Sequence, residues 1–295
     1  MRVLVTGAGG QLGRAVQAVA PEWAAVDAVT HGELDIADEQ SVTDRFRTTR
    51  PEAVINTAAF TSVDAAESET TAAERTNSAG ARILAVACER IGARLIHMST
   101  DYVFAGDQEI PYRPDDPPRP ISTYGRTKLA GELAVRATLP STSAVVRTSW
   151  LYAATGRNFL TRMLDLMNER PVLRVVDDQV GCPTAAAGLA NVLWAFVRSH
   201  GSGIYHWSDA GETTWYQFAA AIADDGVDLG LIPRQIEIIP IRAVDYPTAA
   251  QRPRYSLLDR ATTEDLLGCR ALPWRETLRT TMMAIVRGSA QGDSA

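Results

Sequence analysis

Two side chains suited to proton transfer stand four positions apart, at Tyr124 and Lys128. On a helix this spacing places both on one face. A phenol with a pKa of about 10 is a poor acid or base at neutral pH, but a neighbouring ammonium favours the phenolate and lowers that pKa. Thr100, at the end of an expected strand, could hydrogen-bond a substrate carbonyl oxygen beside Tyr124. We therefore predict that Tyr124, Lys128 and Thr100 catalyse proton transfer at a carbonyl or carbinol.

A glycine motif strengthens this prediction, since a surface tyrosine beside a lysine gives the same spacing by itself. Gly7, Gly10 and Gly13 follow the first expected strand at once and open a helix. Gly7 permits a tight turn, Gly10 lets the backbone approach a pyrophosphate, and Gly13 lets the helix pack on the strand. A purely structural turn is the alternative. Together with the helix that carries Tyr124, this turn predicts hydride transfer with a nicotinamide cofactor.

The choice of cofactor depends on the end of the second expected strand. It reads Val29-Thr30-His31, without the carboxylate that NAD-selective folds use to hold the ribose 2′-hydroxyl. NADPH and NADH are therefore both candidates. His31 or Arg14 could lie near a 2′-phosphate, although an exposed loop residue is the simpler interpretation of His31.

Two further segments could line the cofactor. Asp35 and Ile36 could hold an adenine ring, with the carboxylate accepting a hydrogen bond from its amino group. The alternative is that Asp35 caps the following helix, a role that Asp38 suits better. Small side chains, including Ala58 and Ala59, close the third expected strand and leave room for a ligand at the sheet crevice.

The elements that must position these residues alternate along the first half of the chain. Strands are expected at 2–6, 24–30, 52–56, 94–99 and 144–148, and helices at 11–20, 41–49, 73–91 and after Ser122. This alternation predicts an α/β fold with a Rossmann-type doubly wound parallel sheet. Residues 110–120 hold five prolines and are expected to form an exposed loop.

The rhythm is less regular after Trp150. We assign residues 1–150 to an NAD(P)-binding Rossmann domain and 151–295 mainly to a smaller C-terminal α/β substrate lobe, with segments that return to the Rossmann sheet. The polar residues 288–295 are predicted to be a disordered tail.

Composition excludes several classes of function. The net charge is −6 and the basic residues are scattered, which argues against nucleic acid and anionic membranes as partners. The three cysteines and four histidines are isolated, so neither a disulfide framework nor a zinc site is expected. No signal peptide and no apolar run of roughly 18 residues is visible, and a cytoplasmic location is the simplest expectation.

Many motifs in order give the chain a resemblance to the extended short-chain dehydrogenase/reductase family, and within it to the dTDP-4-dehydrorhamnose reductases, over essentially its whole length. The motifs are GAGGQLG, LDIAD, INTAAFTSVDAAE, STDYVFAG, PISTYGRTKLAGE, VRTSWLY, DDQVGCPT, TTW and RPRYSLLD.

The resemblance implies reduction of the C4 keto group of a dTDP-4-keto-6-deoxyhexose, most simply dTDP-4-dehydro-L-rhamnose to dTDP-L-rhamnose. Tyr124 would be the proton donor, Lys128 would tune its pKa and anchor the cofactor ribose, and Thr100 would assist. Asp101 and Trp150 would contact the deoxysugar, the second lobe would hold the thymidine diphosphate, and residues 182–184 would form a substrate-side loop. The cofactor would be lined by residues from several segments: Gly7, Gly10, Gln11, Leu12, Gly13, Asp35, Ile36, Ala58, Ala59, Phe60, Thr61, Met98, Tyr124 and Lys128.

One departure from the family concerns metal. Some members dimerise through a magnesium site that includes glutamates at positions corresponding to Ala15 and Ala187 here. Alanine supplies none of the oxygen ligands that a hard cation takes. We therefore expect no metal site, and a monomer or weak homodimer.

Two alternatives stay open at this point. A nucleotide-sugar epimerase would hold NAD throughout its cycle, and a dehydratase typically carries Asp-Glu where this chain has Asp101-Tyr102, with one carboxylate. A non-catalytic subunit, like the methionine adenosyltransferase regulatory subunit, has no need of Thr100, Tyr124 and Lys128, and their joint presence argues against it.

Overall fold

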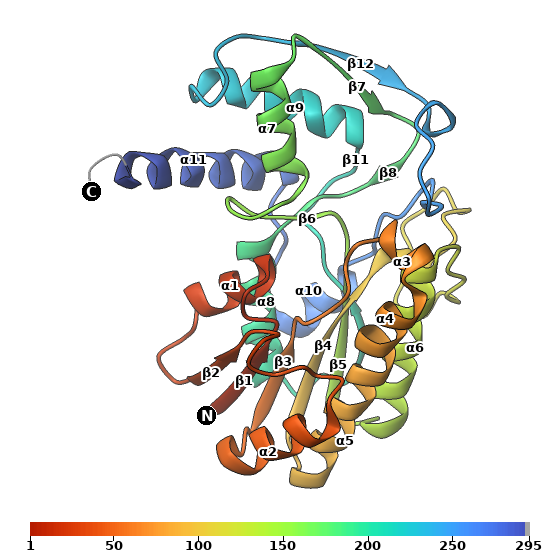
Figure 1. Cartoon of the computed structure of the whole chain (residues 1–295), viewed down its shortest axis with the longest axis vertical. Coiled ribbons are helices and arrows are strands. Elements are labelled where there is room, and N and C mark those ends of the chain that lie inside the picture. The colour runs from red at the N-terminus through yellow and green to blue at the C-terminus, as the bar shows by residue number, and fades with distance from the viewer. Residues whose placement is uncertain (293–295) are drawn as a thin grey trace.

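The centre of the molecule is a six-stranded parallel sheet in a computed structural model that describes residues 1–292 (Figure 1). The strand order is β10-β5-β4-β3-β1-β2. The predicted Rossmann-type parallel sheet is therefore confirmed. The strands are β1 (Arg2–Thr6), β2 (Ala25–Val29), β3 (Ala53–Asn56), β4 (Arg94–Thr100), β5 (Ser143–Thr148) and β10 (Gly203–His206).

Helices cover both faces of the sheet because successive side chains of a buried strand point to opposite sides. Val3 and Val5 of β1 pack in the cluster that holds α1 (Gln11–Ala18) and α8 (Ala186–Arg198). Leu4, between them, packs in the opposite cluster with α2 (Glu39–Thr49), α5 (Ala81–Ile91) and α6 (Thr123–Thr138).

The strand order changes direction between β1 and β3: β2 is added on one side of β1, and β3, β4 and β5 follow on the other. β1 pairs with β2 on one side and with β3 on the other, with Thr6 opposite Asn56. The loops after these two strands diverge to opposite faces, so a crevice opens at their carboxyl ends, where α/β folds bind ligands. The glycine turn and the small residues after Asn56 both lie there.

The long helix expected at 73–91 contains an irregular turn. It consists of α4 (Thr70–Glu74), a π-helical segment η1 (Arg75–Gly80) and α5. The short helix α3 (Ala65–Ser68) precedes it, and the 3₁₀ turn η2 (Asp101–Val103) follows β4. Such π-turns occur frequently at functional sites.

The second lobe lies beyond the carboxyl ends of the strands, at the top of Figure 1. Its core joins α7, α9 and α11 with residues of β7. The elements are β6 (Leu151–Tyr152), α7 (Phe159–Glu169), β7 (Val172–Val176), β8 (Val180–Gly181), β9 (Thr184–Ala185), β11 (Thr213–Thr214), α9 (Trp215–Asp228), β12 (Glu237–Ile241), η3 (Ala243–Asp245) and α11 (Trp274–Gly292). Helix α10 (Ala261–Leu267) instead contacts β10 and α8 of the sheet domain.

The predicted disordered tail is wrong for its first part. Helix α11 continues through residues 288–292, and residues 293–295 lie outside the described part of the chain. In that described part, no helix is both long and apolar enough to cross a membrane.

Candidate active site

A cavity of about 1030 Å³ occupies the crevice between the loops that follow β1 and β3. Its wall brings together every predicted cofactor and catalytic residue except Asp35, and it includes Asp101 and Trp150 but not residues 182–184. Residues separated by more than a hundred positions in the sequence thus share one wall, although their individual roles stay predictions.

The glycine turn has the shape that a dinucleotide requires. Gly7 has a φ of 73°, and an added Cβ would lie 2.6 Å from the amide nitrogen of Ala58. A Cβ on Gly13 would collide with the carbonyl oxygen of Gly7. Gly10 is the N-cap of α1 and has no side chain to accept from the first amides of the helix. These amide N–H groups are therefore free to bind an anionic group in the cavity. The residues present therefore fit a pyrophosphate.

The far end of the cavity is formed by the segment after β2. Arg14 and His31 are exposed and line it, while the carboxylate of Glu33 is turned away to accept from the amide and hydroxyl of Thr30, at 2.8 Å each. This end presents the Arg14 guanidinium and an imidazole and no carboxylate, which suits a 2′-phosphate.

Asp35 lies outside the cavity wall. Its carboxylate accepts from the Ala37 amide at 3.0 Å and pairs with Arg75. Burial acts to raise the pKa of Asp35, but these two partners outweigh it and lower the pKa. Asp38 caps α2 by accepting from Gln40 and Ser41, as the alternative interpretation expected. Ile36 does line the cavity, so the adenine contact is best supported for Ile36 alone.

The catalytic helix α6 begins close to the end of β4. Ser122 caps it by accepting from the amide of Gly125 at 3.1 Å. A Cβ on Gly125 would collide with the carbonyl oxygen of Tyr102, so this glycine lets the helix approach η2. The approach brings Tyr124 to the hydroxyl of Thr100, and the Tyr124 ring meets that of Tyr102 edge-on at 5.7 Å.

Lys128 is buried under the cavity, with Nζ donating to the carbonyl oxygen of Met98 at 2.6 Å. Burial lowers the pKa of Lys128 to about 8, against the opposing charge of Glu132. The lysine therefore stays largely protonated at neutral pH, and its ammonium is fixed to the end of β4.

The predicted lowering of the pKa of Tyr124 is wrong. Burial raises the pKa of Tyr124 to about 12, with the Thr100 hydroxyl opposing the shift and the charge of Asp101 adding to it. The spacing to Lys128 could not reveal this, because it says nothing about desolvation. A phenol that keeps its proton is suited to donate it.

Asp101 is almost fully buried next to this pair. The Thr100 hydroxyl donates to its Oδ1 at 3.0 Å. Burial raises the pKa of Asp101 to about 6, while the hydroxyls of Ser256 and Thr100 oppose that shift. Asp101 is thus a second group whose protonation changes near neutral pH.

Asn77 is a site residue that the sequence did not reveal. It lies in η1, where its Oδ1 accepts from the Phe60 amide at 2.8 Å and its Nδ2 donates to the Phe60 carbonyl at 3.1 Å. Nδ2 also donates to the hydroxyl of Thr127 in α6 at 3.1 Å. Asn77 therefore ties the loop after β3 to the catalytic helix. The sequence did offer one signal: an asparagine inside an expected helix is unfavourable, because its side chain competes for backbone hydrogen bonds, and its presence there indicates a specific role.

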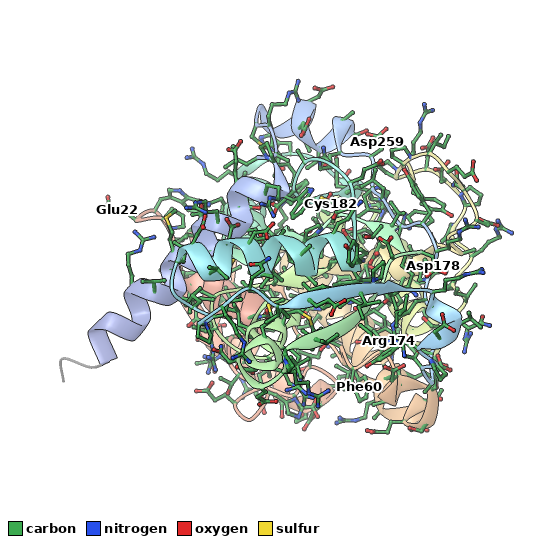
Figure 2. All side chains as sticks on the ribbon, turned by 90° about the horizontal axis from the view of Figure 1, so that it is seen from above. Glu22, Phe60, Arg174, Asp178, Cys182 and Asp259 are labelled. Carbon is green, nitrogen blue, oxygen red and sulfur yellow. The ribbon has the colours of Figure 1, made fainter. Side chains whose placement is uncertain are left out.

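A second cavity of about 1180 Å³ adjoins the first and is lined mainly by α7, β7 and residues 241–252 of the upper lobe. Tyr102 and Trp215 border both. Four arginines line it: Arg162, Arg170, Arg174 and Arg252. Figure 2 looks onto this lobe from above, with Arg174 of β7 labelled. A substrate can thus reach from the catalytic residues toward these cations.

The expected substrate-side role of residues 182–184 stays a prediction. Cys182, Pro183 and Thr184 are buried, and the carbonyl of Cys182 accepts from the Ser149 hydroxyl at 2.6 Å. Through this bond the 182–184 segment supports the segment that carries Trp150.

Comparison with known proteins decides the family. The model of the RmlD substrate binding domain matches residues 1–287. A dTDP-4-dehydrorhamnose reductase from Streptomyces griseus is 43% identical over 267 residues, which cover 88% of this chain and 86% of the relative. The chain belongs to the dTDP-4-dehydrorhamnose reductase family. This membership confirms the predicted resemblance and the class of enzyme, an NAD(P)-dependent oxidoreductase.

Two other members of the family, one known by sequence and one by structure, are similar over most of their length. A dTDP-4-keto-6-deoxy-D-glucose reductase from Streptomyces niveus is 42% identical over 258 residues, covering 87% of this chain and 88% of the relative. The crystal structure of the dTDP-4-dehydrorhamnose reductase of Bacillus anthracis in complex with NADP has a TM-score of 0.90 at 35% identity, covering 96% of this chain and 99% of that one. The family thus favours a reductase over the epimerase, dehydratase and regulatory alternatives.

The expected lack of a metal site stays a prediction. Ala15 lies on α1 and Ala187 on α8, two helices that pack together. Within residues 1–292, no group of three or more histidine, cysteine or acidic side chains is placed to hold a metal ion.

Proposed function

We propose that the protein reduces the C4 keto group of a dTDP-4-keto-6-deoxyhexose with NADPH or NADH, with dTDP-4-dehydro-L-rhamnose as the first candidate substrate. One observation carries the proposal. Tyr124, Lys128 and Thr100 line the same cavity as the glycine turn, and that cavity adjoins a second one lined by arginines. The relatives named above support the substrate class.

Tyr124 and Lys128 can supply the proton that the reduced carbonyl oxygen takes up. A nicotinamide cofactor bound along the glycine turn would supply the hydride that adds to C4. The carbonyl electron pair then moves to oxygen, which takes the phenolic proton of Tyr124. An alkoxide is a stronger base than a phenolate, so a phenol with a pKa of about 12 can still donate to it. The ammonium of Lys128, fixed by Met98, stabilises the negative charge that this leaves on the tyrosine.

The cofactor end supports NADPH as an accepted reductant. Arg14 presents a cationic group that suits a 2′-phosphate, His31 can donate a hydrogen bond beside it, and the relative from Bacillus anthracis was crystallised with NADP.

The second cavity supports a nucleoside diphosphate. Arg162, Arg170 and Arg174 line it, and within residues 1–292 none of these three forms an ion pair. Unpaired guanidinium groups suit the oxygens of a diphosphate, which they bind in bidentate geometry.

The deciding experiment is turnover by the purified protein. We expect loss of the nicotinamide absorbance of NADPH only when a dTDP-4-keto-6-deoxyhexose is added, with the UDP and GDP counterparts as controls. Failure of every such dTDP sugar would refute the proposal. Interconversion of sugars without net loss of NADPH would identify an epimerase instead.

A further inference from the structure

Trp150 adopts a backbone conformation that a bulky residue rarely takes. Its φ is 45°, in the left-handed region. Such a conformation persists only where the surroundings fix it, and it clusters at functional sites. Here the Ser149 hydroxyl donates to the Cys182 carbonyl at 2.6 Å, and the Thr184 amide donates to the Trp150 carbonyl at 3.2 Å. The segment before α7 is thus held to the 182–184 segment on both sides of the strained residue.

The indole of Trp150 is held as tightly as its backbone. It stacks on Trp215 with ring centroids 3.7 Å apart and planes 11° from parallel. Its six-membered ring also lies against Gly181, where an added Cβ would be 2.8 Å from both Cε2 and Cζ2. The φ of Gly181 is not among the positive ones, so its backbone suits any residue. Glycine at this position therefore makes room for the indole.

Trp215 is itself fixed at the start of α9. Thr214 caps the helix, and its side chain and that of Gln217 form a reciprocal capping box. The Thr214 hydroxyl also donates to Asp177, and the Trp215 ring packs on Phe159 at 4.6 Å. Trp215 borders both cavities, whereas Trp150 borders the one that holds Tyr124.

We propose that Trp215 and Gly181 are positioning residues that set the indole of Trp150 as a rigid wall for the sugar ring. Trp215 supports one face of the indole and Gly181 gives it space. An indole presents a flat apolar surface that suits the C–H groups and the methyl of a 6-deoxyhexose. This inference rests on the proposed function, because it takes a sugar nucleotide as the ligand beside Trp150.

The test compares Trp215→Ala, Trp215→Phe and Gly181→Ala with wild type in steady-state kinetics and NADPH titration. We expect Trp215→Ala and Gly181→Ala to raise the KM for the sugar nucleotide at least tenfold, with the dissociation constant of NADPH within twofold of wild type. Trp215→Phe keeps an aromatic surface and should recover most of the loss. Trp23→Ala removes an indole that packs on Trp194, away from both cavities, and is the matched control.

A double-mutant cycle separates positioning from general damage. If Trp215 acts through Trp150, then Trp215→Ala should change KM less than twofold in a Trp150→Ala background. Additive effects, or a wild-type KM in both Trp215→Ala and Gly181→Ala, would overturn the proposal. If Trp215→Ala does not fold, Trp215→Phe takes its place. The KM of Trp215→Phe for the sugar nucleotide should then lie between that of wild type and that of Trp150→Ala.

A spectroscopic measurement keeps this inference distinct from the proposed function. Two stacked indoles couple their electronic transitions, so the near-ultraviolet circular dichroism should change in Gly181→Ala, which keeps both indoles but crowds that of Trp150. It should stay that of wild type in Gly188→Ala, where an added Cβ meets nothing closer than 3.9 Å. If wild type reduces no dTDP-keto sugar, the proposed function fails while this signal still tests the indole position. A wild-type spectrum in Gly181→Ala would show that the indole does not depend on Gly181.

Discussion

Arg147 and Glu132 form an ion pair buried beneath the catalytic helix, with Nη2 of Arg147 2.7 Å from Oε2 of Glu132 and both side chains 1% exposed. Glu132 lies one turn after Lys128, and its charge opposes the lowering of the lysine pKa by burial. The guanidinium also lies 5.0 Å from the centre of the Phe104 ring. This pair connects β5 to the helix that carries Tyr124.

Glu132→Gln should lower the free energy of unfolding by about 3–5 kcal/mol, because it leaves the Arg147 charge buried without a partner. Urea unfolding at neutral pH measures the change. Glu39→Gln makes the same substitution in the exposed pair with Arg90, and should cost less than about 1 kcal/mol. Equal effects of the two variants would contradict the assignment.

Tyr124→Phe should lower kcat by about 10²–10⁴, the usual contribution of one positioned acid. Its NADPH affinity should stay near that of wild type, since the glycine turn lies elsewhere on the cavity wall. Lys128→Met should lower both kcat and the affinity for NADPH. A Tyr124→Phe protein that keeps more than half its kcat would transfer the role of acid to another group, with Asp101 the first candidate.

The rate should fall above a pH of about 8, where Lys128 loses its proton and no longer stabilises the tyrosinate. It should also change near a pH of about 6, because Asp101 is protonated below that value and ionised above it. A pH profile of kcat/KM measures both limbs. Asp101→Asn should remove the lower limb and leave the upper one in place, and a profile unaltered by the variant would be inconsistent with the raised pKa of Asp101.

Arg14→Ala should weaken NADPH about tenfold, or ~1.4 kcal/mol, and leave NADH nearly unchanged, since only NADPH carries the 2′-phosphate. Fluorescence titration with each cofactor makes the comparison. Arg47→Ala is a control, because this exposed arginine pairs with Asp44 on α2. A wild-type preference for NADH above roughly 100-fold, about 2.7 kcal/mol, would show a clamp on the 2′-hydroxyl and refute our interpretation of this end of the cavity.

Turnover should need no divalent cation, because Ala15 and Ala187 supply no oxygen ligand. Activity before and after dialysis against EDTA tests this. Loss of activity with EDTA that Mg²⁺ restores would contradict it.

The periodic elements and the catalytic pair could be predicted from the sequence because both depend on local spacing. The alternation of strands and helices predicted the sheet, and the spacing of Tyr124 and Lys128 placed them on one cavity wall. The sign of the Tyr124 pKa shift could not be predicted, since it arises from residues of distant segments that exclude water. The stacking of Trp215 on Trp150 also depends on how the two lobes pack. The pairing of Asp35 with Arg75 joins segments forty positions apart in the same way.

The place of β10 in the sheet has a consequence for biosynthesis. Strand β5 pairs with β4, which precedes it in the chain, and with β10, which follows it by more than fifty residues. During translation, strand β5 therefore presents an unpaired edge until residue 206 has left the ribosome. Such an edge is a template for pairing with another chain. Truncations that end between residues 150 and 200 are accordingly expected to aggregate, whereas the full chain should stay in solution.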